Sequence, residues 1–140
     1  VGERSGRKFN YGILENKEFT YDTEPACRAV VTMRELKPEK EFEFFKAVQL
    51  AFYYENKNTN DLGIYPVIAA QFGVDKKTFS DKFNSEEMKN KVRNDFTRSG
   101  EMGVRGFPTV VLKKGEEYFL ITNGYDTSEN LIEKINGLIK

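Results

Sequence analysis

The chain has 140 residues, and its 22 basic and 22 acidic side chains balance to a formal net charge of zero. This balance argues against a nucleic-acid partner, which requires a concentrated basic face, and no apolar run approaches the roughly 20 residues of a membrane span. The sequence has no histidine and one cysteine, Cys27. It therefore contains no imidazole base, no histidine-containing metal site and no CxxC pair, and we expect no metal and no cofactor.

Residues 1–21 are expected to form a linker or loop segment. The charged start, 2–8, has no apolar stretch and is not a signal peptide, while 9–14 is either a loop or a short helix. The sequence begins without an initiator methionine, so we expect an upstream part to have been removed or cut away. That start leaves targeting undetermined, and our expectation is a cytoplasmic location.

Residues 22–101 predict a cluster of about five helices. A capping side chain, an acidic residue and a proline in the first turn mark the start of the first helix, at 22–25. Arg28 and Arg34 are expected on its solvent side. The stretch 42–54 is apolar nearly all round and predicts a buried central helix. The other helices are expected over 62–72, after Asp75 and from Ser85 to about Gly100.

Residues 102–140 predict a β-β-α unit that opens with a glycine-rich loop and Pro108. Val110–Leu112 is an unbroken apolar run, which is typical of a strand covered on both faces. A lysine- and glycine-containing turn and a second apolar run, 118–121, predict a hairpin. The last helix is expected to turn its apolar residues inward: Leu131, Ile132, Ile135, Leu138 and Ile139.

Three segments and their order carry a resemblance to a known family. They read Thr-Glu-Pro-Ala-Cys-Arg-Ala-Val at 23–30, Gln-Leu-Ala-Phe-Tyr at 49–53 and Gly-Val-Arg-Gly-Phe-Pro-Thr at 103–109. They resemble the DsbA-like branch of the thioredoxin superfamily, particularly the FrnE-like proteins, over nearly the whole chain. The combination is specific, whereas the Gly-Phe-Pro-Thr segment by itself is not.

The resemblance implies an α/β, thioredoxin-like fold with a large inserted helical domain. In these terms residues 1–21 are a linker, residues 22–101 are the helical domain, and residues 102–140 are the C-terminal ββα half of a thioredoxin fold. The family's N-terminal β-α-β part, with its CxxC motif at a helix N-terminus, has no counterpart in the sequence. The chain is therefore expected to be part of a thiol–disulfide oxidoreductase with no catalytic residue of its own, and inactive by itself.

Cys27 has two interpretations. A free cysteine is most often a small buried core residue, and the resemblance places the corresponding family position in a helix of the inserted helical domain. We therefore expect Cys27 to be a buried core residue, with a redox-sensing or resolving role as the alternative.

The resemblance also assigns the substrate loop: Arg105, Gly106, Phe107, Pro108 and Thr109. On base rates the bond before Pro108 is trans, whereas the resemblance implies a cis bond. The backbone N–H and C=O of Phe107 could then pair with an extended peptide. The alternative is that Phe107 is a core aromatic residue.

Two other functions remain open. Kappa-type glutathione transferases and 2-hydroxychromene-2-carboxylate isomerases share this fold and hold the glutathione backbone with the proline loop, so glutathione is a candidate partner. The third possibility is a non-catalytic module that binds peptides or proteins. Under the first function, the partners are protein thiols and disulfides or a peptide substrate.

The strand 109–112 also predicts self-association. In the family's sheet its neighbour is the first strand, which has no counterpart here, and no charge or proline interrupts the edge. We therefore expect a possible homo-oligomer through this edge, or pairing with an upstream fragment or with residues 1–21.

Overall fold

The computed structural model describes residues 6–140, and the chain divides into two compact units, Val1–Asp95 and Phe96–Lys140. Residues 1–5, which begin the expected linker, lie outside the described residues. The boundary between the units falls inside a long helix, a few residues before the expected division after residue 101. Among the described residues, none of the helices has the length and hydropathy of a membrane span.

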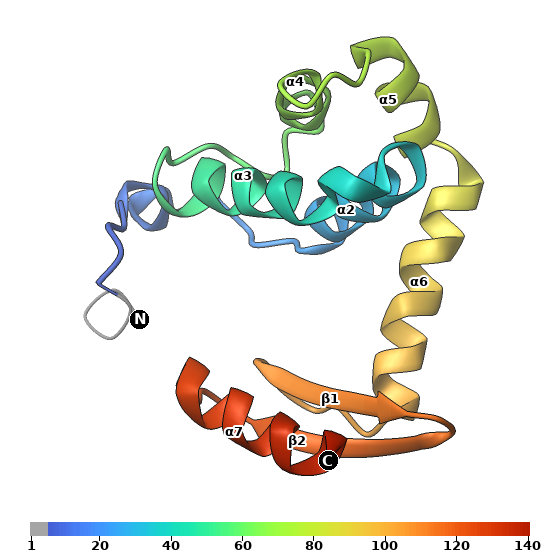
Figure 1. Cartoon of the computed structure of the whole chain (residues 1–140). Coiled ribbons are helices and arrows are strands. Elements are labelled where there is room, and N and C mark those ends of the chain that lie inside the picture. The colour runs from blue at the N-terminus through green and yellow to red at the C-terminus, as the bar shows by residue number, and fades with distance from the viewer. Residues whose placement is uncertain (1–5) are drawn as a thin grey trace. The chain divides into compact units, whose positions relative to one another are not determined.

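The elements follow one another as the helix and hairpin patterns predict (Figure 1). The first unit holds η1 (Gly12–Glu15), α2 (Glu24–Leu36), η2 (Pro38–Lys40), α3 (Glu41–Tyr53), α4 (Ile64–Ala70), α5 (Lys76–Phe83) and most of α6 (Glu86–Glu101). The second unit holds the end of α6, then β1 (Thr109–Lys114), β2 (Glu117–Asn123) and α7 (Ser128–Ile139).

Local capping sets the helix starts. The Asp22 carboxylate accepts a hydrogen bond of 2.9 Å from the N–H of the first residue of α2. At α5 the Asp75 carboxylate accepts from the Thr78 N–H at 2.9 Å, and before α6 the Ser85 hydroxyl accepts from the Met88 N–H at 3.3 Å. These bonds satisfy N–H groups that have no partner inside the helix, and they confirm the predicted starts.

The core of the first unit lies where α2, α3, α4 and α5 meet. A second, smaller cluster joins α2 to α6. The main cluster consists of Ala29, Met33, Phe44, Val48, Ala51, Tyr65, Ile68, Ala69, Phe79 and Phe83.

The helix α3 is not the buried centrepiece that its composition predicts. Phe44 and Val48 are buried, but Phe42 is 80% exposed, and Phe45 and Tyr53 are also exposed. The prediction was wrong because an apolar sequence does not determine which faces of a helix are covered by other elements. In the structure α2 and α4 contact α3 and cover one side of it.

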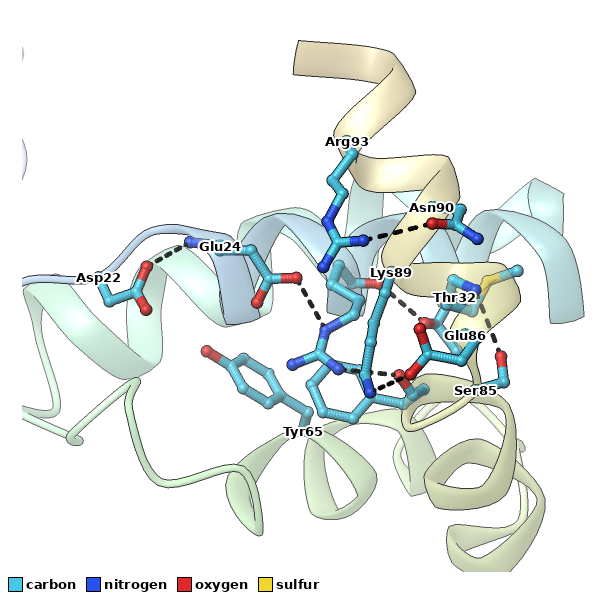
Figure 2. A network of polar contacts seen from close by, with 12 residues as sticks. Asp22, Glu24, Thr32, Tyr65, Ser85, Glu86, Lys89, Asn90 and Arg93 are labelled. Atoms are coloured by element: carbon cyan, nitrogen blue, oxygen red, sulfur yellow. Dashed lines mark hydrogen bonds and ion pairs between the residues drawn. The ribbon is translucent and has the colours of Figure 1, made fainter. Parts of the chain in front are cut away.

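The prediction that Arg28 lies on the solvent side of α2 is also wrong. It is 7% exposed, because its guanidinium lies 4.2 Å from the centre of the Phe83 ring. Its Nε pairs with the Glu24 carboxylate at 3.0 Å, and its Nη1 donates to the Phe83 carbonyl at 3.3 Å. Figure 2 shows its partner Glu24 in a network of polar contacts that also includes Glu86 and Lys89 of α6. The charge is buried because partners from α2 and α5 replace water.

In the second unit, β1 and β2 form an antiparallel hairpin around the two-residue turn Gly115–Glu116, with a bulge at Val110–Val111. The helix α7 packs against β2, as Figure 1 shows. Its apolar residues do not all face inward: Ile132 and Ile139 are exposed. That prediction was wrong because the hairpin covers only one face of α7, and Ile132 and Ile139 lie outside this face.

Candidate functional site

The candidate site is the loop between α6 and β1. The helix α6 ends where the Gly103 N–H donates to the Gly100 carbonyl at 2.9 Å and the Val104 N–H donates to the Ser99 carbonyl at 3.1 Å. Gly103 has a φ of 77°, which a glycine adopts without strain. The chain then passes through the Phe107–Pro108 peptide bond, which is cis in the structure.

Two hydrogen bonds hold the loop from its inner side. The Thr109 hydroxyl donates to the Gly106 carbonyl at 2.6 Å, and the Gly124 N–H donates to the Pro108 carbonyl at 2.8 Å. Gly124 follows β2 and has a φ of 111°. The closed hairpin thus ties the loop to a turn that lies far from it in the sequence.

The outer side of the loop belongs to Phe107. Its side chain is 86% exposed, so the alternative of a core aromatic residue is wrong. Among residues 6–140, neither the backbone N–H nor the C=O of Phe107 has a hydrogen-bond partner. The loop therefore presents one free donor and one free acceptor to solvent.

A cavity of about 480 Å³ lies next to this loop, within the second unit. The end of α6, the turn that follows it and one face of the hairpin form its walls. Arg105 and Thr109 belong both to the cavity and to the candidate loop. The lining consists of Arg98, Glu101, Met102, Gly103, Val104, Arg105, Thr109, Val111, Tyr118, Leu120 and Asn123.

The cavity has cationic surroundings. A hydrogen bond with Arg98, followed by the charge of Lys113, lowers the pKa of the Tyr118 hydroxyl below its usual range. The Lys113 Nζ lies 5.6 Å from the centre of the Tyr118 ring. Glu101 supplies the one carboxylate of the lining.

Cys27 lies in the other unit and is half-buried, packed at the edge of the Val31, Met88 and Val92 cluster. Burial is the largest cause that raises the pKa of its thiol, and nearby carboxylates, Glu24 first, raise it further. A raised pKa leaves less thiolate, the species that attacks disulfides. Among the described residues, no cluster of three possible metal ligands occurs.

Four of the five predicted site residues, 105–108, lie on the loop between α6 and β1, and the fifth, Thr109, is the first residue of β1. Sequence reasoning missed Arg98 and Tyr118 in the cavity and Gly124 under the loop. The Asn123–Gly124 pair was identifiable as a turn. Only the closed hairpin shows that this turn meets Pro108.

Comparison with known proteins identifies the fold. The family model of the DSBA-like thioredoxin domain matches residues 6–136. A crystal structure from Nitrosomonas europaea, described as a "putative protein disulfide isomerase", is 35% identical with a TM-score of 0.94. The alignment covers 99% of this chain and 68% of that one.

Two further structures are of the cytosolic disulfide reductase DsbM from Pseudomonas aeruginosa, one of them with GSH. Their identities are 19% and 18%, and their TM-scores are 0.75 and 0.71. The alignments cover 96% of this chain and 66% of each DsbM chain, just under two thirds. A search among curated proteins found no match. The family model and the Nitrosomonas structure together show that this chain belongs to the family of DSBA-like thioredoxin domains.

Proposed function

We propose that the chain is part of a thiol–disulfide oxidoreductase and supplies its substrate loop and helical unit. The observation that carries the proposal is the exposed Phe107, whose backbone N–H and C=O have no partner among the described residues. An extended peptide can pair with such a donor and acceptor by strand addition. Arg105, Gly106, Pro108 and Thr109 complete the proposed loop.

The chemistry requires a second part. Thiol–disulfide exchange passes through a mixed disulfide, and a second thiol of the enzyme releases it. Cys27 is the one cysteine of the sequence, and its raised pKa disfavours attack. We therefore place the reactive thiol pair outside these 140 residues, in a part that the longer relatives contain and this chain does not span.

The isolated chain is accordingly expected to show no turnover in insulin reduction with dithiothreitol or glutathione as reductant. Measurable turnover above the rate of the reductant alone contradicts the proposal that the reactive thiol pair lies outside this chain. A Cys27→Ser variant is the matched control, because any residual activity that it removes belongs to Cys27.

Peptide binding tests the loop directly. We expect an extended, cysteine-free peptide to shift the NMR signal of the Phe107 amide. The same peptide with N-methylated backbone amides should bind more weakly, because it has lost its donors. Equal binding of the two peptides, or shifts confined to the helical unit, overturns the proposed loop pairing.

Glutathione is the second candidate partner, because one of the structural neighbours is described with GSH. A kappa-type transferase or isomerase predicts saturable glutathione binding, and conjugation or isomerisation by the complete protein without disulfide exchange. Peptide binding without either chemistry in the complete protein favours the non-catalytic module. The expected cytoplasmic location also stays a proposal, supported by one neighbour that is described as cytosolic.

A further inference from the structure

The cavity beside the loop gives the proposed substrate a chemical class. It shares Arg105 and Thr109 with the candidate loop, so a peptide paired with the Phe107 backbone lies next to residues that line the cavity. In an extended peptide, alternate side chains point to the same side. One or two side chains of a paired peptide are therefore available to the cavity, whose volume of about 480 Å³ falls in the usual range for ligand sites.

Part of the cavity lining is apolar. Val111 of β1 and Leu120 of β2 contribute to it, and Leu120 is 65% exposed. Met102, after α6, adds a flexible thioether side chain that adapts to different partners. Covering these groups with an aliphatic side chain removes apolar surface from water, which favours binding.

The lining of the cavity also carries positive charge. Arg98 and Arg105 both line the cavity, and Glu101 is the single carboxylate of the lining. The Lys113 ammonium lies 5.6 Å from the ring centre of Tyr118, which is also a lining residue. The lowered pKa of Tyr118 agrees with this surplus of positive charge. A guanidinium binds a carboxylate with two parallel hydrogen bonds, which is stronger and more specific than a neutral contact.

We propose that the cavity binds an acidic side chain, together with an aliphatic side chain two residues away, of an extended peptide held by the loop. Arg98 and Arg105 bind the carboxylate, while Val111 and Leu120 contact the aliphatic group. The inference rests on the proposed function, because the loop pairing brings the peptide to the cavity. It adds a specificity: substrates with a glutamate or aspartate beside the paired residue bind more tightly than neutral ones.

The test uses the full 140-residue chain and two capped peptides, acetyl-Ser-Glu-Thr-Leu-Thr-amide and its glutamine counterpart, in which the acidic or amide residue and the leucine lie on the same side of the extended peptide. We expect the glutamate peptide to bind about five- to tenfold more tightly, as charge-assisted hydrogen bonds at an open site allow. Its binding should shift the methyl signals of Val111 and Leu120. Arg98→Gln and Arg105→Gln should each reduce the preference for the glutamate peptide over the glutamine peptide.

Arg93→Gln is the matched control, because Arg93 lies on α6 in the other unit and outside the cavity lining. It makes the same change in charge and should keep the preference. An equal loss in Arg93→Gln shows a general charge effect and overturns the proposed site.

The two proposals fail differently. If both peptides shift the Phe107 amide with equal affinity, the loop pairing stands and the acidic specificity is wrong. If neither peptide shifts that amide, the loop pairing fails and the specificity fails with it. If 4-phenylbutanoate binds the cavity as tightly as the glutamate peptide, the site recognises small acids, and the peptide assignment is overturned.

Discussion

At the scale of single residues, the Thr109 hydroxyl makes one of the two hydrogen bonds that hold the loop. Thr109 is half-buried, and its hydroxyl donates to the Gly106 carbonyl at 2.6 Å. Thr109→Val keeps the shape and removes this bond. We expect the free energy of unfolding to fall by about 1 kcal/mol and the amides of residues 105–108 to exchange faster, as measured by chemical denaturation and hydrogen exchange.

The control for this prediction is Thr97→Val, at an exposed position on α6. It should leave both measurements unchanged. Loop amides that exchange at the wild-type rate in Thr109→Val show that the Gly124–Pro108 hydrogen bond is sufficient to hold the loop.

Arg28 gives the second prediction at this scale. Arg28→Met keeps an unbranched side chain against the Phe83 ring, but it leaves the Glu24 carboxylate without its ion-pair partner and the Phe83 carbonyl without its hydrogen-bond donor. Breaking a fully buried pair costs roughly 3–5 kcal/mol. Because Glu24 is partly exposed, we expect a smaller loss, about 2 kcal/mol, in denaturant unfolding.

The comparison is Arg93→Met, which removes the same charge from an exposed position on α6 and should cost less than about 0.5 kcal/mol. Equal losses in the two variants contradict a structural role for the burial of Arg28.

At the scale of elements, Asp126 lies just before the N-cap residue of α7, Thr127, and binds the first turns of the helix. Its carboxylate accepts hydrogen bonds from the Thr127 N–H at 2.9 Å, the Asn130 side chain at 2.8 Å and the Lys134 ammonium at 2.7 Å. These bonds, that of Lys134 first, lower the pKa of Asp126 from 3.8 to about 2. A lowered pKa means that the folded state favours the ionised carboxylate, so its contribution is present above the unfolded pKa.

We therefore expect α7 to lose this contribution as the pH falls from about 4 to about 2. The NMR signals of Leu131 and Ile135, followed against pH, report on α7. Asp126→Asn should remove the transition, whereas Glu133→Gln, on the same helix but outside these bonds, should retain it. A transition that persists in Asp126→Asn assigns it to another group.

Comparison of the elements shows what the sequence could predict. Helix starts at Asp22, Asp75 and Ser85 were predictable because caps act within a few residues. The glycines and the proline of residues 103–108 made a loop before β1 predictable in the same way, whereas the substrate-binding role of residues 105–109 comes from the family resemblance and stays a prediction. The exposure of Phe42 was not predictable, because it depends on which element covers each row of α3.

Long-range partners limited the prediction of the site as well. Arg28 meets Phe83 and Gly124 meets Pro108 only after the chain folds, and no local pattern joins either pair. The cavity is lined by the end of α6 and by both strands, which are separate in the sequence. The sequence therefore did not predict that Arg98 and Arg105 line the same cavity. The acidic and basic residues of the whole chain balance, so the net charge did not reveal the local excess of positive charge around this cavity.

At the scale of the whole molecule, the second unit has little interior of its own. Among the buried apolar residues of the described chain, Ile121, at 6% exposure, is the one that lies in this unit. Its sheet has two strands, and such a hairpin is marginally stable without further packing. Ile132 and Ile139 of α7 are exposed as well.

The edge of β1 away from β2 therefore leads to the final prediction, which concerns self-association. In the described residues this edge has no strand partner, and Thr109–Leu112 carries neither a charge nor a proline to protect it. We predict that the chain pairs this edge with a second copy at high concentration. Light scattering over a concentration series should show a dimer, and intact-mass analysis should show no bound fragment.

Val110→Lys places a charge on that edge and should return the chain to a monomer, because a lysine on an edge strand opposes strand pairing. Ile139→Lys makes the same change on α7, away from the edge, and should leave the dimer intact. If Ile139→Lys alone dissociates the dimer, the apolar face of α7 forms the contact and the edge does not. A wild-type chain that stays monomeric at every concentration, without a fragment, shows that an open edge of this length is stable in solution.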